Sequence, residues 1–265
     1  MSNALGIIPA RWASTRFPGK PLHSIAGKPL LQHVWEASRR AKRLDHLIIA
    51  TDDFRIAEAA FAWGAEVALT SKNHLSGTDR VAEVAAKAKQ FAHIVNIQGD
   101  EPMIDPKLID HLVRELQRDR KLEMITAAHP FADPREAESP HQVKVVVNIK
   151  SEALYFSRAL IPSTRSGGLQ TTGQRGRFGK RCSLILRHQG LYGYTRALLL
   201  RFVRWESSPL ERAEALEQLR ALENGVRIKV VMVGSGSPGV DTPEDARMIE
   251  RLLVSAGQRF PKSRR

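Results

Sequence analysis

Residues 7–22 read IIPARWASTRFPGKPL, and this stretch joins an apolar run to a basic loop. The apolar run covers residues 5–8, and the loop carries Arg11, Arg16 and Lys20 among its prolines. A buried strand that ends in a stiff, basic, glycine-containing loop is typical of polyphosphate sites in α/β proteins. The cations neutralise the phosphate charge, prolines limit the freedom of the loop, and glycine lets main-chain N–H groups approach the anion. An ordinary surface loop with solvated charges is the alternative interpretation.

Two glycine motifs of nucleotide-binding proteins can be excluded. A Walker A loop needs Gly five residues before Gly-Lys and Ser or Thr after it, whereas this chain has Ser14 and Pro21 there. Residues 234–239, GSGSPG, match a dinucleotide fingerprint literally. That fingerprint requires a helix at once, another strand and an acid about 20 residues later. Here a proline follows and then the last predicted helix, so we reject it.

Length and composition indicate a globular protein. With 265 residues, 42% apolar and 6% aromatic, the chain forms one large α/β domain or one domain with an insertion. The single cysteine, Cys182, excludes an intramolecular disulfide and a cysteine-based zinc site, and it suits a reducing compartment. There is no visible signal peptide, and no apolar run approaches the ~20 residues that span a bilayer. We therefore expect a cytoplasmic protein that does not insert into membranes.

The net charge of +13 raises the question of an anionic partner. Residues 153–205 contain ten Arg or Lys and no acid, and the last residues, 255–265, are also basic. The basic residues are not interleaved with aromatics as in single-strand binding platforms. We also find no zinc finger or RNA-binding signature. An RNA-binding protein with a degenerate nucleotide fold remains the alternative from another class, but no nucleic-acid partner is expected.

Hydrophobic patterning predicts alternating strands and helices. Short apolar runs, predicted as strands, occupy residues 5–8, 47–51, 94–97, 124–127, 143–149, 184–186 and 228–233. Helical periodicity occupies residues 30–42, 54–63, 80–88, 107–119 and 210–223. This alternation predicts an α/β fold, a three-layer α/β/α arrangement around a mostly parallel, doubly wound sheet. Ligands of such sheets bind outside the carboxyl ends of the strands, near the topological switch point.

Two acidic segments are candidates for a metal site. QGDEP at residues 98–102 directly follows an apolar run, so Asp100 lies at a strand's carboxyl end, where a carboxylate can hold Mg²⁺. A turn with solvated carboxylates is the alternative. PGVDTPED at residues 238–245 contains the start of a helix, which explains its acids structurally. The functional interpretation makes Asp241 a second metal ligand opposite Asp100.

Other polar segments indicate less. SGTDR at residues 76–80 is a turn entering a helix, which binds a base or simply caps the helix. RHQGLY at residues 187–192 gathers polar groups at a predicted strand end. A solvated helix face is the default for the row Glu211, Glu214, Glu217 and Gln218. Residues 162–180 are rich in Gly, Ser, Thr and Arg and predict an excursion from the sheet.

A family resemblance rests on motifs that occur in order between residues 5 and about 253. They are IPARWASTRFPGKPL, IIATDD, SGTDR, VNIQGDEPMI, VKVV, ALYFSR, RHQGLYGY, SPLE, LEQLR, LENG and PGVDTPED. This set resembles the 3-deoxy-manno-octulosonate cytidylyltransferase (CMP-Kdo synthetase) family. The resemblance implies a glycosyltransferase-A-like nucleotidyltransferase fold, that of nucleotide-diphospho-sugar transferases. It implies one domain over residues 1–255, with a CTP-binding half (about 1–130), a sugar-binding and dimerisation half (about 139–235) and a basic tail, 256–265.

The resemblance also implies a reaction. CTP and Kdo (3-deoxy-D-manno-octulosonate) would give CMP-Kdo and pyrophosphate, through attack of the sugar's anomeric hydroxyl on the α-phosphorus. The product would supply Kdo for lipopolysaccharide biosynthesis, and the enzyme would be a Mg²⁺-dependent homodimer. The same chemistry on 8-amino-Kdo or another 2-keto sugar acid, such as sialic acid, is the alternative. Trp12 and Phe17 stand where tyrosine and leucine are common, and Ser139-Pro140-His141 replaces Asn-Pro-Asn.

Site residues are implied at positions that match the family's motifs. For CTP these are Ala10, Arg11, Ser14, Thr15, Lys20, Thr78, Arg80 and Gln98. The implied catalytic residues are Lys20, Arg11 and Asp100, with Lys20 stabilising the leaving pyrophosphate and Asp100 and Asp241 binding Mg²⁺. For the sugar they are Arg158, His188, Tyr192, Glu211 and Gln218. Arg158 would pair the sugar carboxylate, and Glu211 would accept hydrogen bonds from sugar hydroxyls.

Overall fold

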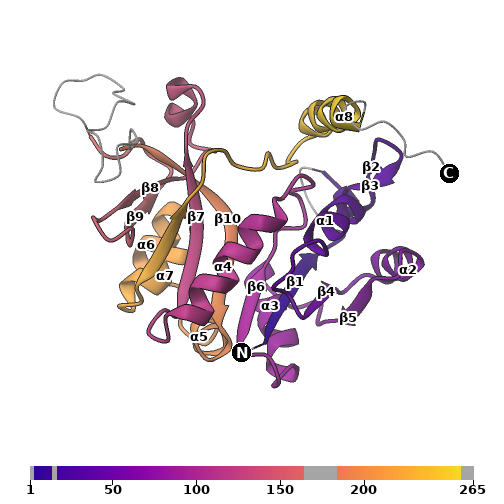
Figure 1. Ribbon diagram of the computed structural model, residues 1–265, viewed down its shortest axis with the longest axis horizontal. Coiled ribbons are helices and arrows are strands. Elements are labelled where there is room, and N and C mark those ends of the chain that lie inside the picture. The colour runs from indigo at the N-terminus through magenta and orange to yellow at the C-terminus, as the bar shows by residue number, and fades with distance from the viewer. Residues whose placement is uncertain (1–2, 14–16, 164–183, 258–265) are drawn as a thin grey trace. The chain divides into compact units, whose positions relative to one another are not determined.

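The computed structural model describes residues 3–13, 17–163 and 184–257. The chain divides into two compact units. The first unit comprises residues 3–111 and the C-terminal segment from residue 237, and the second comprises residues 112–236. The excursion predicted at residues 162–180 lies almost wholly outside the described residues. Figure 1 labels most of the helices and strands of both units.

The first unit is built on four parallel strands. Their order is β6 (His93–Asn96), β1 (Ala4–Ala10), β4 (His46–Thr51) and β5 (Glu66–Leu69). Strand β1 is buried at nearly every position, and so is β6. Continuous apolar sequence of this kind forms strands that are covered on both faces, because helices pack on either side of a parallel sheet.

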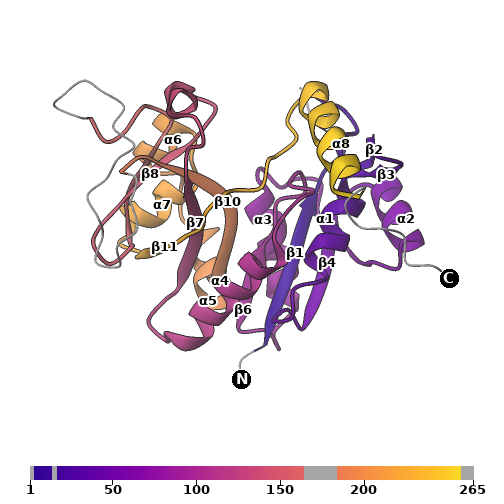
Figure 2. The ribbon, with the colours of Figure 1, turned by 45° about the horizontal axis from the view of Figure 1, so that its top comes forward.

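The path of the chain through this sheet creates a switch point. After β1 it runs through α1 (Leu30–Ser38), β4 and α2 (Phe54–Ala62) to β5, and α3 (Gly77–Lys87) then returns it to β6 on the other side of β1. Right-handed crossovers place the helices before and after this reversal on opposite faces. Figure 2 shows α1 and α3 on opposite sides of β1. The loops that follow β1 and β6 therefore meet at the crevice where such sheets bind ligands.

The C-terminal helix α8 (Pro243–Gly257) belongs to the first unit. Its apolar residues form a core cluster with the opening loop, the hairpin of β2 (Ser24–Ile25) and β3 (Lys28–Pro29), and α1. The buried members of the cluster are Phe17, Ile25, Leu30, Val240, Ala246 and Ile249. Thr242 and Asp245 cap the helix reciprocally, Asp245 N donating to Thr242 Oγ1 at 3.2 Å and Thr242 N donating to Asp245 Oδ2 at 2.8 Å. The predicted helix start is confirmed.

The second unit has a mixed sheet. Its order is β11 (Ile228–Met232), β7 (Met124–Pro130), β10 (Leu186–Thr195), β8 (Lys144–Val147) and β9 (Ala153–Ser157). Strands β11 and β7 are parallel, and the other pairs are antiparallel. Helix α4 (Pro106–Arg118) leads into the unit, where η2 (Pro134–Glu138) and α5 (Arg196–Phe202) follow β7 and β10. The predicted α/β fold with a mostly parallel sheet is confirmed.

One predicted helix is wrong. Residues 210–223 form two short helices, α6 (Pro209–Glu214) and α7 (Gln218–Glu223), instead of one amphipathic helix. The break lies at Ala215, which adopts a left-handed conformation with φ of 51°. The Arg158 guanidinium donates to the carbonyl oxygens of Glu214 (2.8 Å) and Ala215 (3.4 Å), which satisfies main-chain groups that a continuous helix would have used itself. A side chain that directly follows the distant strand β9 therefore stabilises the break.

The strand boundary near residue 186 also differs from the prediction. We predicted a strand over residues 184–186 with polar groups at its end, but β10 begins at Leu186 and runs to Thr195. The polar groups lie inside the strand, where the register against β7 shifts between Gln189 and Tyr192. A bulge changes the direction in which side chains point within a strand. Because the bulge interrupts the regular pattern of the strand, the sequence predicted a shorter one. Strands β5 and β9 were not predicted at all, because both are partly exposed and neither is a continuous apolar run.

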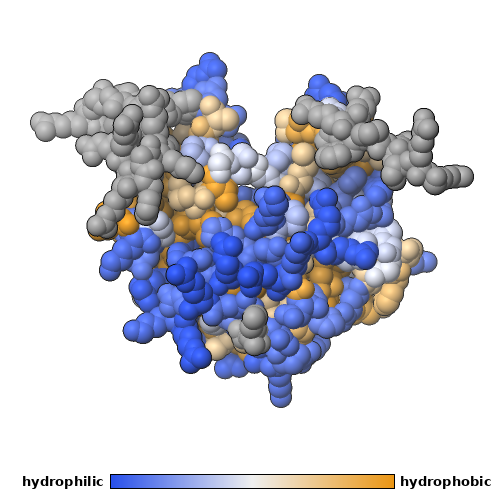
Figure 3. All heavy atoms as spheres, in the orientation of Figure 1, coloured by the Kyte–Doolittle hydropathy of each residue, from blue (hydrophilic) through white to orange (hydrophobic). Residues whose placement is uncertain are grey.

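The surface carries much of the chain's charge. Hydrophilic residues cover much of the face drawn in Figure 3, with apolar residues between them. Several basic side chains are paired with acids there or elsewhere on the surface, among them Arg135 with Asp133, Arg201 with Glu123 and Arg247 with Glu244. Within the described part of the chain, no helix combines the length and the apolar character needed to cross a membrane.

Candidate active site

The first unit brings together three residues that are distant in sequence. The Lys20 Nζ donates to Asp100 Oδ2 at 2.7 Å and to the carbonyl oxygen of Val240 at 2.9 Å. It also lies 3.6 Å from Asp241 Oδ1. Lys20 is largely buried, with 17% of its side chain exposed, whereas Asp241 is 60% exposed. One face of this cluster is therefore enclosed by protein, and the other is open to solvent.

Local structure explains why these side chains converge. Gly19, with φ of +70°, turns the chain so that Lys20 begins the short helix η1 (Lys20–Leu22). Asp100 follows β6 at the switch point, and its carbonyl oxygen accepts a hydrogen bond from Val240 N at 2.9 Å. The burial of Val240 in the core under α8 holds the last segment in place. Packing of the C-terminal helix therefore completes the cluster.

The cluster fits a divalent cation. Asp100 and Asp241 already share one cation, the Lys20 ammonium, so both carboxylates can reach a common positive centre. Carboxylate oxygens suit Mg²⁺, which is commonly held by one or two carboxylates, with waters and substrate phosphates completing its shell. Among the described residues, no group of three or more His, Cys, Asp or Glu could hold a metal ion. An Mg²⁺ ion held by Asp100 and Asp241 would therefore take its remaining ligands from waters and substrate phosphates.

Gly99 allows the two loops to approach each other. A Cβ atom at this position would lie 2.9 Å from the carbonyl oxygen of Pro9, closer than real Cβ atoms come to main-chain oxygens. The ends of β1 and β6 can therefore be this close only with glycine at residue 99. Gln98, the neighbouring CTP-binding candidate, is partly buried, and Ala10 is buried at the end of β1.

Gly99→Ala is expected to lower the free energy of unfolding by about 1–3 kcal/mol, because the added Cβ pushes main chain against main chain. It should also weaken CTP binding, since the loops after β1 and β6 move apart. Chemical denaturation and CTP titration measure the two effects. Gly234→Ala is the matched control, because a Cβ there meets nothing within 4 Å. Equal stability of the two variants would contradict the steric argument.

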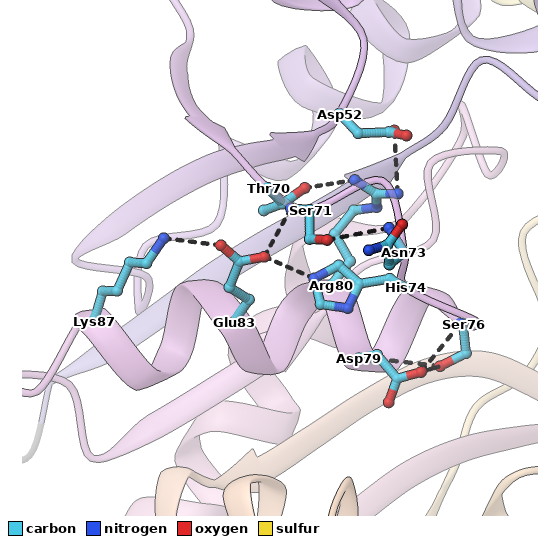
Figure 4. Close-up of polar contacts among 10 residues, drawn as sticks. All are labelled: Asp52, Thr70, Ser71, Asn73, His74, Ser76, Asp79, Arg80, Glu83 and Lys87. Carbon is cyan, nitrogen blue, oxygen red and sulfur yellow. Dashed lines mark hydrogen bonds and ion pairs between the residues drawn. The ribbon is translucent and has the colours of Figure 1, made fainter.

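The start of α3 is organised by a buried arginine (Figure 4). Arg80 is 4% exposed, forms an ion pair with Asp52 at 3.1 Å and donates to Thr70 Oγ1. Ser76 and Asp79 form a capping box at the helix start, so the capping interpretation of SGTDR is confirmed. Asp52 and Thr70 follow β4 and β5 directly, and Arg80 thus joins two strand ends to α3. Thr78 is also buried, and it lies in the first turn of α3.

Glu83 fixes the loop that precedes α3 (Figure 4). Its carboxylate accepts hydrogen bonds from Lys87 Nζ at 2.8 Å, Ser71 N at 2.9 Å and His74 Nε2 at 2.7 Å. These bonds, the one from Lys87 foremost, lower the pKa of Glu83 to about 2. The carboxylate is therefore ionised at neutral pH and holds the loop against the helix.

In the second unit, His188 and Tyr192 lie on either side of the β10 bulge, with ring centroids 5.3 Å apart. The Nε2 of His188 lies 3.1 Å from Thr126 Oγ1, and its ring packs edge-on against Phe156. Burial lowers the pKa of His188 to about 3, so the imidazole is neutral at pH 7. Burial also raises the pKa of Tyr192 well above its ordinary value, and the nearby Thr126 offsets this only in part.

Two of the residues implied for the sugar carry a buried polar atom without a hydrogen-bond partner among the described residues. The Tyr192 hydroxyl and the Gln218 Nε2 are enclosed, yet neither has a hydrogen-bond partner among the described residues. Leaving a buried polar group unsatisfied costs about 1–3 kcal/mol. Both atoms belong to residues that the sequence assigns to the sugar. Unsatisfied donors of this kind are suited to a polyhydroxylated ligand.

Glu211 is buried, contrary to the solvated helix face that we predicted for its row. Its carboxylate accepts from Ser208 N at 3.1 Å in a capping box and from Arg220 Nε at 2.7 Å and Nη2 at 2.5 Å. Burial alone would raise the pKa of Glu211, but the bonds from Arg220 and Ser208 outweigh it and lower the pKa. Gln218 is likewise only 6% exposed. The solvated-face prediction fails for both because α6 and α7 pack on the sheet as separate helices.

Arg158 is anchored by several groups. Its guanidinium donates to main-chain carbonyls of Pro140, Glu214 and Ala215, and its main-chain N donates to Glu214 Oε2 at 2.9 Å. Its own carbonyl accepts from the fully buried Lys144, which also donates to two other carbonyls. Its role toward a sugar carboxylate stays a prediction, as does that of Glu211.

Comparison with known proteins decides the family. The model of the cytidylyltransferase family matches residues 5–228. The 3-deoxy-manno-octulosonate cytidylyltransferase of Solibacter usitatus (strain Ellin6076) is 50% identical over 252 residues, which is 95% of this chain and 95% of that protein. The chain belongs to the 3-deoxy-manno-octulosonate cytidylyltransferase family. The member from Geobacter metallireducens is 47% identical over 93% of this chain and 96% of its own length.

A solved structure agrees with this membership. A CMP:2-keto-3-deoxy-manno-octonic acid synthetase complexed with CTP matches with a TM-score of 0.86 and 38% sequence identity, covering 96% of this chain and 100% of that one. Within this cytidylyltransferase, Lys20, Asp100 and Asp241 meet in the first unit, and His188 meets Tyr192 in the second. Arg11 is exposed beside β1. Ser14 and Thr15 lie outside the described residues.

The neutral His188 predicts acid destabilisation. Its folded-state pKa of about 3 lies below its ordinary value of 6.5, so the unfolded chain binds a proton that the folded chain refuses. Stability is therefore lost as pH falls from about 6.5 toward 3, by up to about 2 kcal/mol at pH 5. The lowered pKa of Glu83 adds a loss only below its ordinary value of 4.5.

Urea denaturation at pH 7.5 and pH 5 measures this loss. His188→Gln removes the titrating group, so the difference in unfolding free energy between the two pH values should shrink by the His188 contribution. The exposed His46→Gln serves as the matched control and should keep the full difference. An unchanged pH dependence in His188→Gln would show that other groups cause it.

Proposed function

We propose that this protein transfers CMP from CTP to Kdo, giving CMP-Kdo and pyrophosphate. The observation that carries the proposal is the cluster in which Lys20 Nζ binds Asp100 and lies beside Asp241, at the carboxyl end of β6. Such a cluster at a switch point suits a nucleotide's phosphates, because cationic and metal-binding groups are positioned together. Membership in the family supplies the base and the sugar.

The proposed chemistry asks the chain mainly for positioning and charge stabilisation. The anomeric hydroxyl of the sugar acid loses its proton to solvent, and its oxygen forms a bond to the α-phosphorus as the bond to the pyrophosphate oxygen breaks. We assign Lys20 to the charge that develops on the departing pyrophosphate, with Arg11 as a second cation of the loop. Lys20 is suited to this role because Asp100 and the Val240 carbonyl hold its ammonium in a fixed, mostly buried position.

Mg²⁺ is the proposed cofactor, with Asp100 and Asp241 as its protein ligands. When bound there, the ion would neutralise phosphate charge and act as a Lewis acid on the reacting phosphate. In the nucleotide pocket, Gln98, Thr78 and Arg80 would frame the cytidine, with Arg80 held in position by Asp52. In the sugar pocket, the unpartnered Tyr192 hydroxyl and Gln218 amide would bind sugar oxygens, and a neutral His188 would accept or donate one hydrogen bond.

The finer biological setting is also proposed. The family resemblance supports a homodimer and a role in supplying Kdo for lipopolysaccharide. The single cysteine supports a reducing compartment, which we take to be the cytoplasm. Gel filtration coupled to light scattering tests the dimer. A monomer at the concentration of the activity assay would exclude an obligate dimer.

The decisive experiment measures pyrophosphate release from CTP and Mg²⁺ with three acceptors, namely Kdo, 8-amino-Kdo and sialic acid. We expect release with Kdo, dependence on added Mg²⁺ after EDTA treatment, and CMP-Kdo as the product by mass spectrometry. Preference for 8-amino-Kdo or sialic acid would keep the chemistry but change the substrate. No release with any sugar acid, together with tight, salt-dependent RNA binding, would overturn the enzyme assignment.

A further inference from the structure

A stacked arginine lies beside the opening loop of the first unit. The guanidinium carbon of Arg55, at the start of α2, lies 3.5 Å from the centre of the Trp12 ring. Both oxygens of Asp53 hold that guanidinium, Oδ1 accepting from Nε at 3.0 Å and Oδ2 from Nη2 at 2.6 Å. Asp53 also caps α2, accepting from Arg55 N at 2.9 Å. The orientation of the arginine is thus fixed by a rigid helix end.

Trp12 in turn contacts the point where the loop closes. Gly19 N donates to the Trp12 carbonyl oxygen at 3.3 Å. A Cβ atom on Gly19 would lie 3.2 Å from two carbons of the indole ring, so the ring packs directly on this glycine. Trp12 directly follows Arg11, and Gly19 directly precedes Lys20. A contact that fixes the indole of Trp12 therefore also restricts the positions of Arg11 and Lys20.

We propose that Asp53, Arg55 and Trp12 form a positioning clamp for the opening loop, residues 11–20. The clamp holds Arg11 and Lys20 where the phosphates of CTP bind. The clamp rests on the proposed function, since it assigns a role within the same nucleotide site. Arg55 acts through Trp12 and does not contact substrate, because its guanidinium is already bound by Asp53 on one side and stacked on the indole. Arg55 and Asp53 are positioning residues in this scheme.

The chain contains a matched pair without the clamp. Asp133 caps η2 and binds the Arg135 guanidinium through both oxygens, Oδ1 accepting from Nε at 3.2 Å and Oδ2 from Nη2 at 2.6 Å, in the same arrangement as Asp53 and Arg55. Unlike Arg55, which stacks on Trp12, Arg135 stacks on no aromatic ring of the described residues. An exposed ion pair alone contributes about 0–1 kcal/mol to stability. Comparing the two arginines therefore separates stacking on Trp12 from the ion pair itself.

The test compares Arg55→Ala with Arg135→Ala in steady-state kinetics. Arg55→Ala keeps the main-chain cap of α2, so the protein should fold with a melting temperature close to that of wild type. We expect its KM for CTP to rise about two- to fivefold, the range for one exposed cation–π contact, with kcat nearly unchanged because at saturating CTP the bound phosphates themselves hold Arg11 and Lys20 in place. Arg55→Lys should recover part of the loss, and Arg135→Ala should match wild type. Equal KM values for the two alanine variants would overturn the clamp.

Two further measurements make the assignment specific. In a Trp12→Ala background, adding Arg55→Ala should cost nothing more in KM, because both changes remove the same contact. Acrylamide should quench Trp12 more strongly in Arg55→Ala than in wild type, with Trp12→Phe supplying the signal of the other tryptophans. Unchanged quenching, or additive KM effects, would also overturn the clamp. The quenching measurement needs no CTP. It therefore tests the clamp even if the wild-type protein fails to bind CTP, a result that would refute the proposed function.

Discussion

Asp100→Asn is expected to lower kcat for pyrophosphate release from CTP and Kdo by about a hundredfold or more, the scale of losing one essential charge-stabilising group. Asparagine keeps the size of the side chain but removes the negative charge that we assign to Mg²⁺. It also removes the carboxylate that Lys20 binds at 2.7 Å, so the cation loses its nearest partner. The measurement is coupled pyrophosphate detection at saturating CTP, Mg²⁺ and Kdo.

The control for this variant is Glu36→Gln. Glu36 binds Lys28 at 2.8 Å in the same unit, so it forms the same kind of lysine–carboxylate pair away from the switch point. Its replacement should leave kcat within about twofold, because an exposed pair contributes little. CTP with Mg²⁺ should raise the melting temperature of wild type more than that of Asp100→Asn. Full activity in Asp100→Asn would mean that this carboxylate is only part of a turn.

Lys20→Ala should depress kcat about a hundred- to a thousandfold, since negative charge on the departing pyrophosphate loses its nearest cation. The effect should be large because Lys20 is mostly buried and its ammonium is fixed by two acceptors. A positioned, partly desolvated charge stabilises a transition state far better than a solvated one. Single-turnover measurements separate this effect on chemistry from any change in product release.

Lys28→Ala is the matched control for Lys20→Ala. Lys28 lies eight residues further on in the same unit and is exposed, with 46% of its side chain accessible. Its loss should change kcat by no more than about twofold. If Lys20→Ala matched this control, Lys20 would be an ordinary surface cation, and the charge on pyrophosphate would have to be stabilised by Arg11 or the metal.

Local sequence predicted the first unit well. Strands β1, β4 and β6 were found because each contains a short apolar run, which is the pattern of strands covered on both faces. Helix α8 was found from Thr242, Pro243 and Asp245, since capping is a local interaction. These features depend on neighbours within a few residues, and the chain encodes them directly.

The second unit was predicted less well because distant contacts decide it. The sequence predicted one helix over residues 210–223, but the left-handed conformation of Ala215 breaks it. Arg158, more than 50 residues away in the chain, binds the carbonyl oxygens at that break. The sequence predicted that Glu211 is solvent-exposed, whereas in the structure its carboxylate is buried and accepts hydrogen bonds from Arg220 and Ser208. Lys144 is fully buried against main-chain carbonyls, which no local pattern indicates. Periodicity measures only which face a residue takes, not what covers that face.

The sequence by itself determined the alternation of strands and helices, the basic loop after β1 and, through its ordered motifs, the family. Only the tertiary structure brought Lys20 to Asp100 and Asp241, across 80 and 221 residues of chain. It also placed Arg55 on Trp12 and Asp52 on Arg80. The physical reason is that a side chain's chemistry is local, whereas its partners are set by sheet order and by the burial of α8.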